Sequence, residues 1–351
     1  MKLFKATIIG HYGGGLEYFD GQTIKTKNLT DVLVQLFGKE SIKTIDTHGG
    51  FRKILQVIIQ TGKAIKESYN VIMLPAHNGV VVLSPIMVFF KKLYPSHKIH
   101  YVVIGGWLPK ILRKRILLRK CLKGFDGIYV ETSTMKESIE KFGLKNVQIL
   151  PNFKVLKRNK EEDKTLQKEL TEPYKLCTFS RVIKAKGIEE AVNAVNKINE
   201  FFNRDVFRLD IYGSIDDSES KWFEELKGRF GNNIKYKGVV LSQQSSLVLN
   251  QYFALLFPTR FYTEGIPGTI IDAYAVGVPV ISSRWESFND VVDDGITGIG
   301  YDFNSNEGLY DVLLNVANDP NLINSLRNNC YNKYYLYTPE HALKSLVERM
   351  I

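Results

Sequence analysis

The chain has 351 residues, of which 44% are hydrophobic and 24% are charged. This length exceeds what one hydrophobic core usually serves, so it predicts two domains with the composition of a globular protein. No apolar run is long enough to span a bilayer, and the N-terminus lacks the pattern of a secretory signal. The three cysteines are widely spaced and give neither a disulfide framework nor a metal-binding spacing, which suits the reducing cytoplasm.

The net charge of +10 is concentrated in one stretch of the sequence. No acidic residue occurs between Glu67 and Asp126, whereas ten basic residues do. Within this window, residues 108–122 are expected to form one basic helix that also carries apolar side chains. Such a helix suits an anionic membrane surface, so we expect the basic region 91–123 to contact one. A solvated surface with a chance excess of charge is the plain alternative.

Nucleic acid is the other usual partner of a basic stripe. This partner is disfavoured because the region carries no nucleic-acid-binding motif and no array of stacking aromatic residues. We therefore expect no nucleic-acid partner.

The first half of the chain alternates strand-like apolar runs with helical patterns. Strands are expected at residues 5–9, 71–74, 100–104 and 127–130, and helices at 28–36, 51–67, 80–93 and 135–142. Alternation of this kind predicts βαβ units around a parallel sheet. The pattern ends at Pro151-Asn152, before a charged stretch at 157–172, which marks the expected domain boundary.

The second half repeats the alternation. Strands are expected at residues 176–179, 208–212, 234–236, 254–257 and 278–282, and helices at 188–201, 220–230, 243–250, 268–276 and 307–316. The sequence thus predicts two Rossmann-like α/β domains, 1–152 and 153–330, which face each other across a cleft. A helical segment at 331–351 is expected to pack back on the first domain. Ligands of open parallel sheets bind at the carboxyl ends of the strands.

The strongest motif follows the strand expected at 254–257. Glu264 and Gly265 come first, and Gly268-Thr269 then open a helix that carries Asp272 one turn further on. Unsatisfied N–H groups at a helix start favour a phosphate, and glycine allows its close approach. An acid before such a helix can bond sugar hydroxyls, and an acid inside it can accept those of a ribose. For one acid alone, an ordinary complement to the helix dipole would be the better explanation.

A second motif links the strand expected at 176–179 to the next helix. Arg181 and Lys186 lie five residues apart in this loop, so both side chains can point to the cleft. Two cations there can neutralise a departing diphosphate. On its own, a basic loop is usually only solvated.

Together these segments resemble the donor-site signature of GT-B glycosyltransferases of family GT4. Glu264 and Asp272 are separated by seven residues, as in that signature, and are followed by Gly-Val-Pro-Val at 277–280 and Asp-Gly-Ile-Thr-Gly at 294–298. Arg181 and Lys186 match the Arg–x4–Lys-Gly arrangement of the family. The resemblance implies that both cations hold a diphosphate, that Glu264 orients the donor sugar and that Asp272 contacts the ribose, although the family usually has glutamate at this last position.

Weaker matches occur elsewhere. Gly14 and Gly15 follow the first strand, like the glycine-rich loop of the family that faces the donor phosphates. Gly213 matches a glycine turn near the nucleotide. Leu150-Pro151-Asn152 resembles the hinge signature, with Phe153 where the family has glycine.

The first domain departs from its relatives after the strand expected at 100–104. Where relatives often carry a histidine or an acid, this chain has Gly105-Gly106-Trp107. Trp107 is either a stacking wall for an acceptor sugar or a packed core aromatic. His77 is either the remaining acceptor-side candidate or a hydrogen-bonded loop histidine. Trp285 and Glu286 are further candidates to line the cleft.

The resemblance implies a retaining glycosyltransferase that moves a sugar from a UDP- or GDP-sugar to a hydroxyl of a saccharide acceptor. It requires no cofactor, and no Asp-x-Asp pair or His/Cys cluster suggests a metal. The basic region favours a lipid-linked acceptor, for instance a polyprenyl diphosphate, at the inner membrane surface in capsule, exopolysaccharide or O-antigen assembly. Two alternatives stay open: a GT-B sugar-nucleotide epimerase, and a non-catalytic protein that binds sugar nucleotides or nucleic acid.

Overall fold

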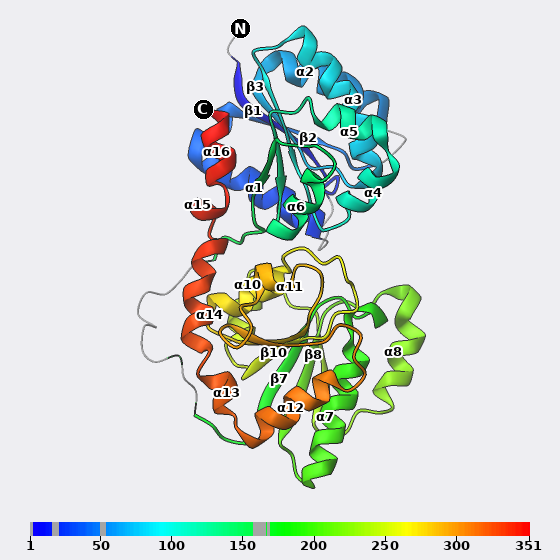
Figure 1. Cartoon of the computed structure of the whole chain (residues 1–351), viewed down its shortest axis with the longest axis vertical. Coiled ribbons are helices and arrows are strands. Elements are labelled where there is room, and N and C mark those ends of the chain that lie inside the picture. The colour runs from blue at the N-terminus through cyan, green and yellow to red at the C-terminus, as the bar shows by residue number, and fades with distance from the viewer. Residues whose placement is uncertain (1–2, 16–20, 50–53, 157–165, 167–168) are drawn as a thin grey trace. The chain divides into compact units, whose positions relative to one another are not determined.

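Figure 1 shows the computed structural model of the chain, which describes residues 3–15, 21–49, 54–156, 166 and 169–351. The chain divides into two compact units. Unit 1 comprises Met1–Val155 and Thr338–Ile351, and unit 2 comprises Leu156–Tyr337. The boundaries expected at 152/153 and 330/331 thus compare with observed ones at 155/156 and 337/338. Most of the charged stretch expected at 157–172 lies outside the described residues.

Unit 1 is built on a six-stranded parallel sheet with the order β2-β1-β3-β4-β5-β6. The strands are β1 Phe4–Gly10, β2 Ile42–Asp46, β3 Ser68–Met73, β4 Lys98–Val102, β5 Gly127–Val130 and β6 Val147–Ile149. The helices are α1 Gly21–Phe37, α2 Ile54–Glu67, α3 His77–Leu93, α4 Leu108–Lys114, α5 Ile116–Leu122, α6 Ser133–Glu140, α15 Pro339–Ala342 and α16 Lys344–Met350, with a 3-10 turn η1 at Lys39–Ser41.

Both faces of this sheet are buried, as the apolar runs of its central strands require. Successive strand residues point to opposite faces. Ile8 accordingly joins the core under α1 and α16, whereas Ile9 joins the core under α2, α3 and α5. Figure 1 shows these two sets of helices on opposite sides of the sheet.

The basic helix expected at 108–122 is in fact two short helices. The break falls at Arg115, whose backbone is non-helical at φ −128° and ψ 87°. The Arg119 guanidinium donates to the carbonyl oxygens of Leu112 and Arg113, at 2.5 and 2.7 Å. A side chain thus takes acceptors that N–H groups of a continuous helix would use, and this stabilises the end of α4.

Unit 2 has a six-stranded parallel sheet with the order β12-β11-β10-β7-β8-β9. The strands are β7 Tyr174–Phe179, β8 Phe207–Tyr212, β9 Ile234–Gly238, β10 Ala254–Phe257, β11 Val280–Ser283 and β12 Gly298–Tyr301. The helices are α7 Ile188–Phe202, α8 Ser220–Lys227, α9 Ser245–Leu249, α10 Gly268–Ala275, α11 Phe288–Val291, α12 Gly308–Asn318, α13 Asn321–Asn324 and α14 Arg327–Lys333. Short 3-10 turns lie at η4 Lys184–Lys186, η5 Asp217–Glu219 and η6 Tyr334–Tyr337.

The strand order of unit 2 reverses between β7 and β10, which pair directly. Loops that leave the sheet at such a reversal run in opposite directions and frame a crevice at the carboxyl ends of the strands. Here the two loops also touch. Gly187 has φ +69°, and a Cβ on it would lie 1.8 Å from the carbonyl oxygen of Pro258. In unit 1 the corresponding reversal lies between β1 and β3.

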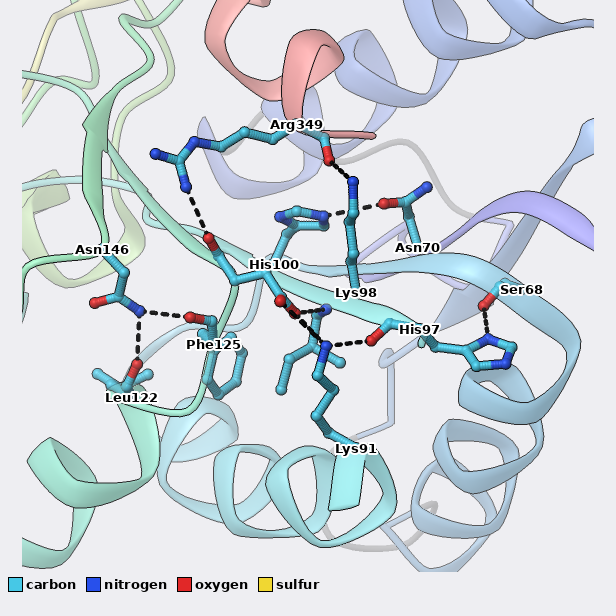
Figure 2. Close-up of polar contacts among 12 residues, drawn as sticks. Ser68, Asn70, Lys91, His97, Lys98, His100, Leu122, Phe125, Asn146 and Arg349 are labelled. Atoms are coloured by element: carbon cyan, nitrogen blue, oxygen red, sulfur yellow. Dashed lines mark hydrogen bonds and ion pairs between the residues drawn. The ribbon is translucent and has the colours of Figure 1, made fainter. Parts of the chain in front are cut away.

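The C-terminal helix α16 is attached to unit 1 through polar contacts at β3 and β4 (Figure 2). Lys98 Nζ donates to the Arg349 carbonyl at 2.7 Å, and the Arg349 guanidinium donates to the Asp126 carbonyl at 2.9 Å. The Asn70 amide donates to the carbonyls of Lys5 and Met350. These bonds satisfy the last carbonyls of α16, which have no acceptor role inside the helix.

His100 is completely buried beneath this attachment. Because both Asn70 N–H groups are used on carbonyls, the Asn70 amide oxygen must accept, and His100 Nε2 donates to it at 3.1 Å. Tyr129 then donates to His100 Nδ1 at 3.2 Å. Each nitrogen therefore has the partner that suits a neutral ring. Burial lowers the pKa of His100 to about 4, although Asp126 opposes the shift.

This burial predicts a loss of stability in acid. Between pH 6.5 and about 4 the unfolded chain binds a proton at His100 that the folded chain does not, so the free energy of unfolding falls as the pH falls through this range. The contribution of His100 amounts to about 3 kcal/mol. Urea unfolding at pH 7, 6, 5 and 4 measures it. A His100→Gln variant should show a shallower decline, and an unchanged slope would contradict the assignment.

The contact between the loops that follow β7 and β10 predicts a second effect. Gly187→Ala should lower the free energy of unfolding by more than about 2 kcal/mol, because the methyl group meets the Pro258 carbonyl in addition to the strain of a left-handed backbone. Gly295→Ala is the matched control, since its φ is +73° but a Cβ there meets nothing within 4 Å. If urea unfolding shows the same loss of unfolding free energy for both variants, the clash with the Pro258 carbonyl makes no contribution of its own.

Candidate functional site

Lys186 and Glu264 meet at the strand-order reversal of unit 2. Lys186 ends the turn η4, in the loop between β7 and α7, and Glu264 lies in the loop between β10 and α10. The Lys186 ammonium forms an ion pair with Glu264 Oε1. Only 15% and 17% of the two side chains are exposed, so the pair is shielded from solvent on most sides. Two of the residues expected from the sequence are thus bonded to each other.

Neighbouring groups hold this pair in place. The Lys186 ammonium lies 5.5 Å from the ring centroid of Phe257 and 5.2 Å from that of Phe261, which are distances for cation–π attraction. The Thr259 hydroxyl donates to Glu264 Oε1 at 3.1 Å and accepts from the Phe261 amide at 3.1 Å. The sequence motifs gave no reason to select Thr259 or Phe261, although both lie on the short segment between β10 and Glu264.

Arg181 lies on the same loop as Lys186 but approaches a different neighbour. Its side chain is 62% exposed, and its guanidinium is 4.0 Å from Asp216 Oδ2 in the loop after β8. The pKa of Asp216 is lowered by hydrogen bonds from Ser218 and then by the charge of Arg181. Gly213 precedes this loop with φ +136°, and a Cβ there would lie 1.7 Å from the Ser180 carbonyl oxygen. Only glycine allows the two loops to approach so closely.

The helix α10 begins beside Glu264. Its N-cap Pro267 supplies no side-chain cap, so the first N–H groups of the helix are not satisfied in the usual way. The Thr269 hydroxyl is buried and has no hydrogen-bond partner among the described residues. Gly265 is buried and Gly268 half-buried in the same segment. This helix start therefore offers donors of the kind that bind an anion.

Asp272 differs from the other expected site residues because its side chain is turned into the protein. It is 1% exposed, and its Oδ2 accepts a hydrogen bond from Ser245 at 2.7 Å. A glutamate, longer by one methylene, is the residue that the GT4 signature usually has here. The ribose contact expected of Asp272 stays a prediction.

In unit 1, the glycine-rich loop after β1 is tied to β2. Asp46 accepts hydrogen bonds from the amides of Tyr12, Gly14 and His48, at 2.9, 2.8 and 2.8 Å. Burial acts to raise the pKa of Asp46, but these three bonds outweigh it and hold the pKa below its usual value. The Gly14 amide is thus bonded to a carboxylate, and Gly15 is exposed next to it.

His77 and Trp107 are stacked, with ring centroids 4.0 Å apart and an interplanar angle of 27°. His77 is the first residue of α3, and Trp107 donates its Nε1–H to the Ile104 carbonyl after β4 at 2.6 Å. Burial and then the charge of Lys110 lower the pKa of His77, so the ring is neutral at pH 7. His77 also lines a cavity of about 390 Å³, whose apolar lining comes from Val57 of α2, from Pro75 and Ala76 before α3, and from Val82 and Leu83 of α3.

Trp285 and Glu286, the two further candidates to line a cleft, differ in their exposure to solvent. Trp285 is 2% exposed and packs against Phe257 and Phe288 in the core of unit 2, whereas Glu286 is exposed. In the part of the chain that the structure describes, no group of three or more His, Cys, Asp or Glu side chains is placed to hold a metal ion.

Comparisons with known proteins agree with this architecture. Residues 173–319 match the family model described as Glycosyl transferases group 1. An uncharacterized glycosyltransferase of Methanocaldococcus jannaschii is 22% identical over 161 residues, which are 46% of this chain and 40% of that protein. This chain therefore covers less than half of the length of that relative.

Solved structures resemble the whole chain. HepE of Anabaena, crystallised with UDP and glucose, has a TM-score of 0.72 and 12% identity, with 98% of each chain covered. Sucrose-phosphate synthase of Thermosynechococcus elongatus has a TM-score of 0.72 and 14% identity, over 98% of this chain and 97% of that one. The lipopolysaccharide outer core galactosyltransferase WaaB has a TM-score of 0.70 and 16% identity, over 100% and 99%.

These likenesses confirm the predicted α/β architecture of two Rossmann-like units, each with a parallel six-stranded sheet. By its fold the chain is a GT-B protein, and its residues 173–319 are similar to the family of group 1 glycosyltransferases.

Proposed function

We propose that this protein transfers a sugar from a nucleoside diphosphate sugar to a hydroxyl of a saccharide acceptor. The observation that carries the proposal is the meeting of Lys186, Glu264 and the start of α10 at the strand-order reversal of unit 2. A cation and unsatisfied helix donors suit a diphosphate, and a carboxylate beside them suits sugar hydroxyls. The family match of residues 173–319 supports the same activity.

In this reaction the bond between the sugar carbon and the diphosphate oxygen breaks, and a bond to the acceptor oxygen forms. Lys186 and the more exposed Arg181 would stabilise the negative charge that develops on the leaving diphosphate. The leaving phosphate oxygen would take the proton of the acceptor hydroxyl, so no side chain is needed as a nucleophile. We expect the configuration of the sugar carbon to be retained, as in GT4 enzymes. Catalysis then rests on positioning and on charge stabilisation.

We propose UDP-sugars as the first donors to test, with GDP-sugars second. HepE was crystallised with UDP and with UDP-glucose, and its fold covers 98% of this chain. Thr269 and Gly268 at the start of α10, with Gly213 after β8, are the proposed neighbours of the nucleotide.

For the acceptor we propose unit 1, at the stacked rings of His77 and Trp107. Sugar rings pack well on aromatic faces, and the neutral His77 adds a hydrogen-bonding nitrogen. The neighbouring cavity is lined by Val57, Val82 and Leu83 among others, so it suits the apolar part of a lipid-linked acceptor.

Exposed apolar and basic side chains on unit 1 support the proposal of a lipid-linked acceptor. Helix α3 packs between α2 and α5 (Figure 1). Each of the three helices carries large apolar side chains that are exposed. Leu55 on α2 is 72% exposed, Phe89 on α3 is 59% exposed and Leu117 on α5 is 71% exposed. The same region of the chain carries exposed cations on α3, on α4 and α5, and beside them, at Lys92, Lys110, Arg113, Lys114, Arg115, Lys120 and Lys123.

Exposed apolar and basic side chains together suit the headgroup region of an anionic bilayer. In the described ranges, none of the helices is both long and apolar enough to cross a membrane. We therefore propose peripheral attachment to the inner membrane surface and a role in the assembly of bacterial surface polysaccharides.

Substitution of the two cations tests the reaction. Lys186→Ala and Arg181→Ala should each lower kcat with a UDP- or GDP-sugar by about 10²- to 10³-fold, because each removes charge stabilisation of the leaving group. Arg181→Ala should leave the unfolding temperature nearly unchanged because its side chain is 62% exposed, whereas Lys186→Ala should lower it because the largely buried Glu264 carboxylate loses its partner. Donors are first found by thermal stabilisation and then assayed for hydrolysis and transfer. Lys184→Ala is the matched control, since Lys184 is an exposed lysine on the same loop. Wild-type turnover in both variants would refute the role of the cations.

Vesicle sedimentation tests the membrane surface. The protein should pellet with vesicles that contain phosphatidylglycerol and stay in solution with phosphatidylcholine alone. Ile116→Ser/Leu117→Ser should weaken pelleting, whereas Leu247→Ser, which removes a similarly exposed apolar side chain from unit 2, should not. Equal pelleting with both vesicle types would remove the basis for this surface.

A further inference from the structure

The Lys186 ammonium is surrounded by one carboxylate and two aromatic rings from the loops after β7 and β10. The Glu264 carboxylate forms an ion pair with it, and the rings of Phe257 and Phe261 lie 5.5 and 5.2 Å away. Both charged side chains are largely buried. The pair is neutral overall, so a diphosphate that reaches Lys186 also meets the negative charge of Glu264.

We propose that Glu264 discriminates against the free nucleoside diphosphate and in favour of the sugar-linked form. This inference rests on the proposed function, because it assumes that Lys186 binds the diphosphate. Its new element is the sign of the contribution of Glu264: this residue weakens the binding of the product and so favours its release.

Charge supplies the first half of the argument. A free nucleoside diphosphate ends in a phosphate monoester whose second ionisation has a pKa of about 6, so at pH 7.5 it carries about one more negative charge than the sugar diester. The added charge falls on the terminal phosphate, which is the group that Lys186 would hold. Within a partly buried site, like charges a few ångströms apart repel strongly. The carboxylate of Glu264 therefore opposes the product more than the donor.

The hydrogen-bond pattern of Glu264 supplies the second half. Its Oε1 is used by Lys186 and by the Thr259 hydroxyl. Its Oε2 has no hydrogen-bond partner within the residues that the structure describes. A carboxylate oxygen accepts readily from sugar hydroxyls. A ligand that carries its sugar can offset the repulsion in this way, whereas the free diphosphate brings no hydroxyl to that position.

Thr259 fits this scheme as a positioning residue. It is 1% exposed, its hydroxyl both donates to Glu264 and accepts from the Phe261 amide, and its carbonyl accepts from Ser283 Oγ at 2.6 Å. The hydroxyl is therefore held in one orientation on Oε1, and Oε2 stays available to accept from a ligand.

Calorimetric titration of the full chain with UDP and UDP-glucose tests the proposal, with GDP and GDP-mannose as the second pair. Glu264→Gln keeps the shape and the acceptor oxygen for Thr259 but removes the charge. The Kd for the free diphosphate should fall about tenfold in this variant, while the Kd for the nucleotide sugar stays the same or rises. Glu172→Gln is the matched control, since Glu172 pairs with Arg204 just before β7 and so lies at the amino-terminal end of that strand, away from the candidate site.

A second comparison covers the case in which Glu264→Gln does not fold. Lys186→Met/Glu264→Ala should bind the free diphosphate more tightly than Lys186→Met alone, because the carboxylate repels the ligand even when its partner is gone. Equal or weaker diphosphate binding after loss of Glu264, or an equal gain in Glu172→Gln, overturns the proposal and leaves the proposed function intact. A wild-type protein that binds neither nucleoside diphosphates nor their sugar forms overturns the proposed function itself.

Discussion

The direct pairing of β7 with β10 is the constraint on which the candidate site depends. These strands are far apart in the chain, and Lys186 and Glu264, which follow them, are separated by 78 residues. Parallel pairing brings the carboxyl ends of both strands to the same end of the sheet, so the two loops that follow them lie next to each other. The contact of Gly187 with Pro258 brings them closer still, and the ion pair, the two phenylalanine rings and Thr259 are consequences of that closeness.

Much of this fold could be predicted from the sequence. The strands that were not predicted share a physical cause. The central strand β10 and residues 71–73 of β3 are continuous apolar runs because helices cover both faces of the two sheets. The edge strand β2 was not expected, since only Ile42 and Ile45 are apolar and buried in Ile42–Asp46, and the other three residues are lysine, threonine and aspartate. The edge strand β12 was missed because two of its four residues are glycines. Edge strands have one unpaired side and so need less apolar character.

The candidate site could be predicted only in part, because a sequence motif gives the position of a residue along the chain and not the direction of its side chain. Motif spacing selects residues by their place along the chain, and it selected Lys186 and Glu264, whose side chains the structure brings together as an ion pair. It says nothing about the direction of a side chain, which depends on packing against distant elements. Asp272 is indeed one turn into α10, yet its carboxylate points to Ser245 in the interior. Thr259 and Asp216 became visible only as spatial neighbours, because a single threonine or aspartate in a loop carries no pattern of its own.

The division of unit 1 between two parts of the chain has a consequence for synthesis. Leu346 and Met350 of α16 belong to the core beside Ile8 and Tyr129, but they leave the ribosome only after all of unit 2 has been made. Helix α1 lies on the same face, but the part of the face that α16 covers stays exposed while some 180 residues are translated, a count that follows from Leu156–Tyr337. During that interval the nascent chain exposes an apolar surface of the kind that chaperones bind.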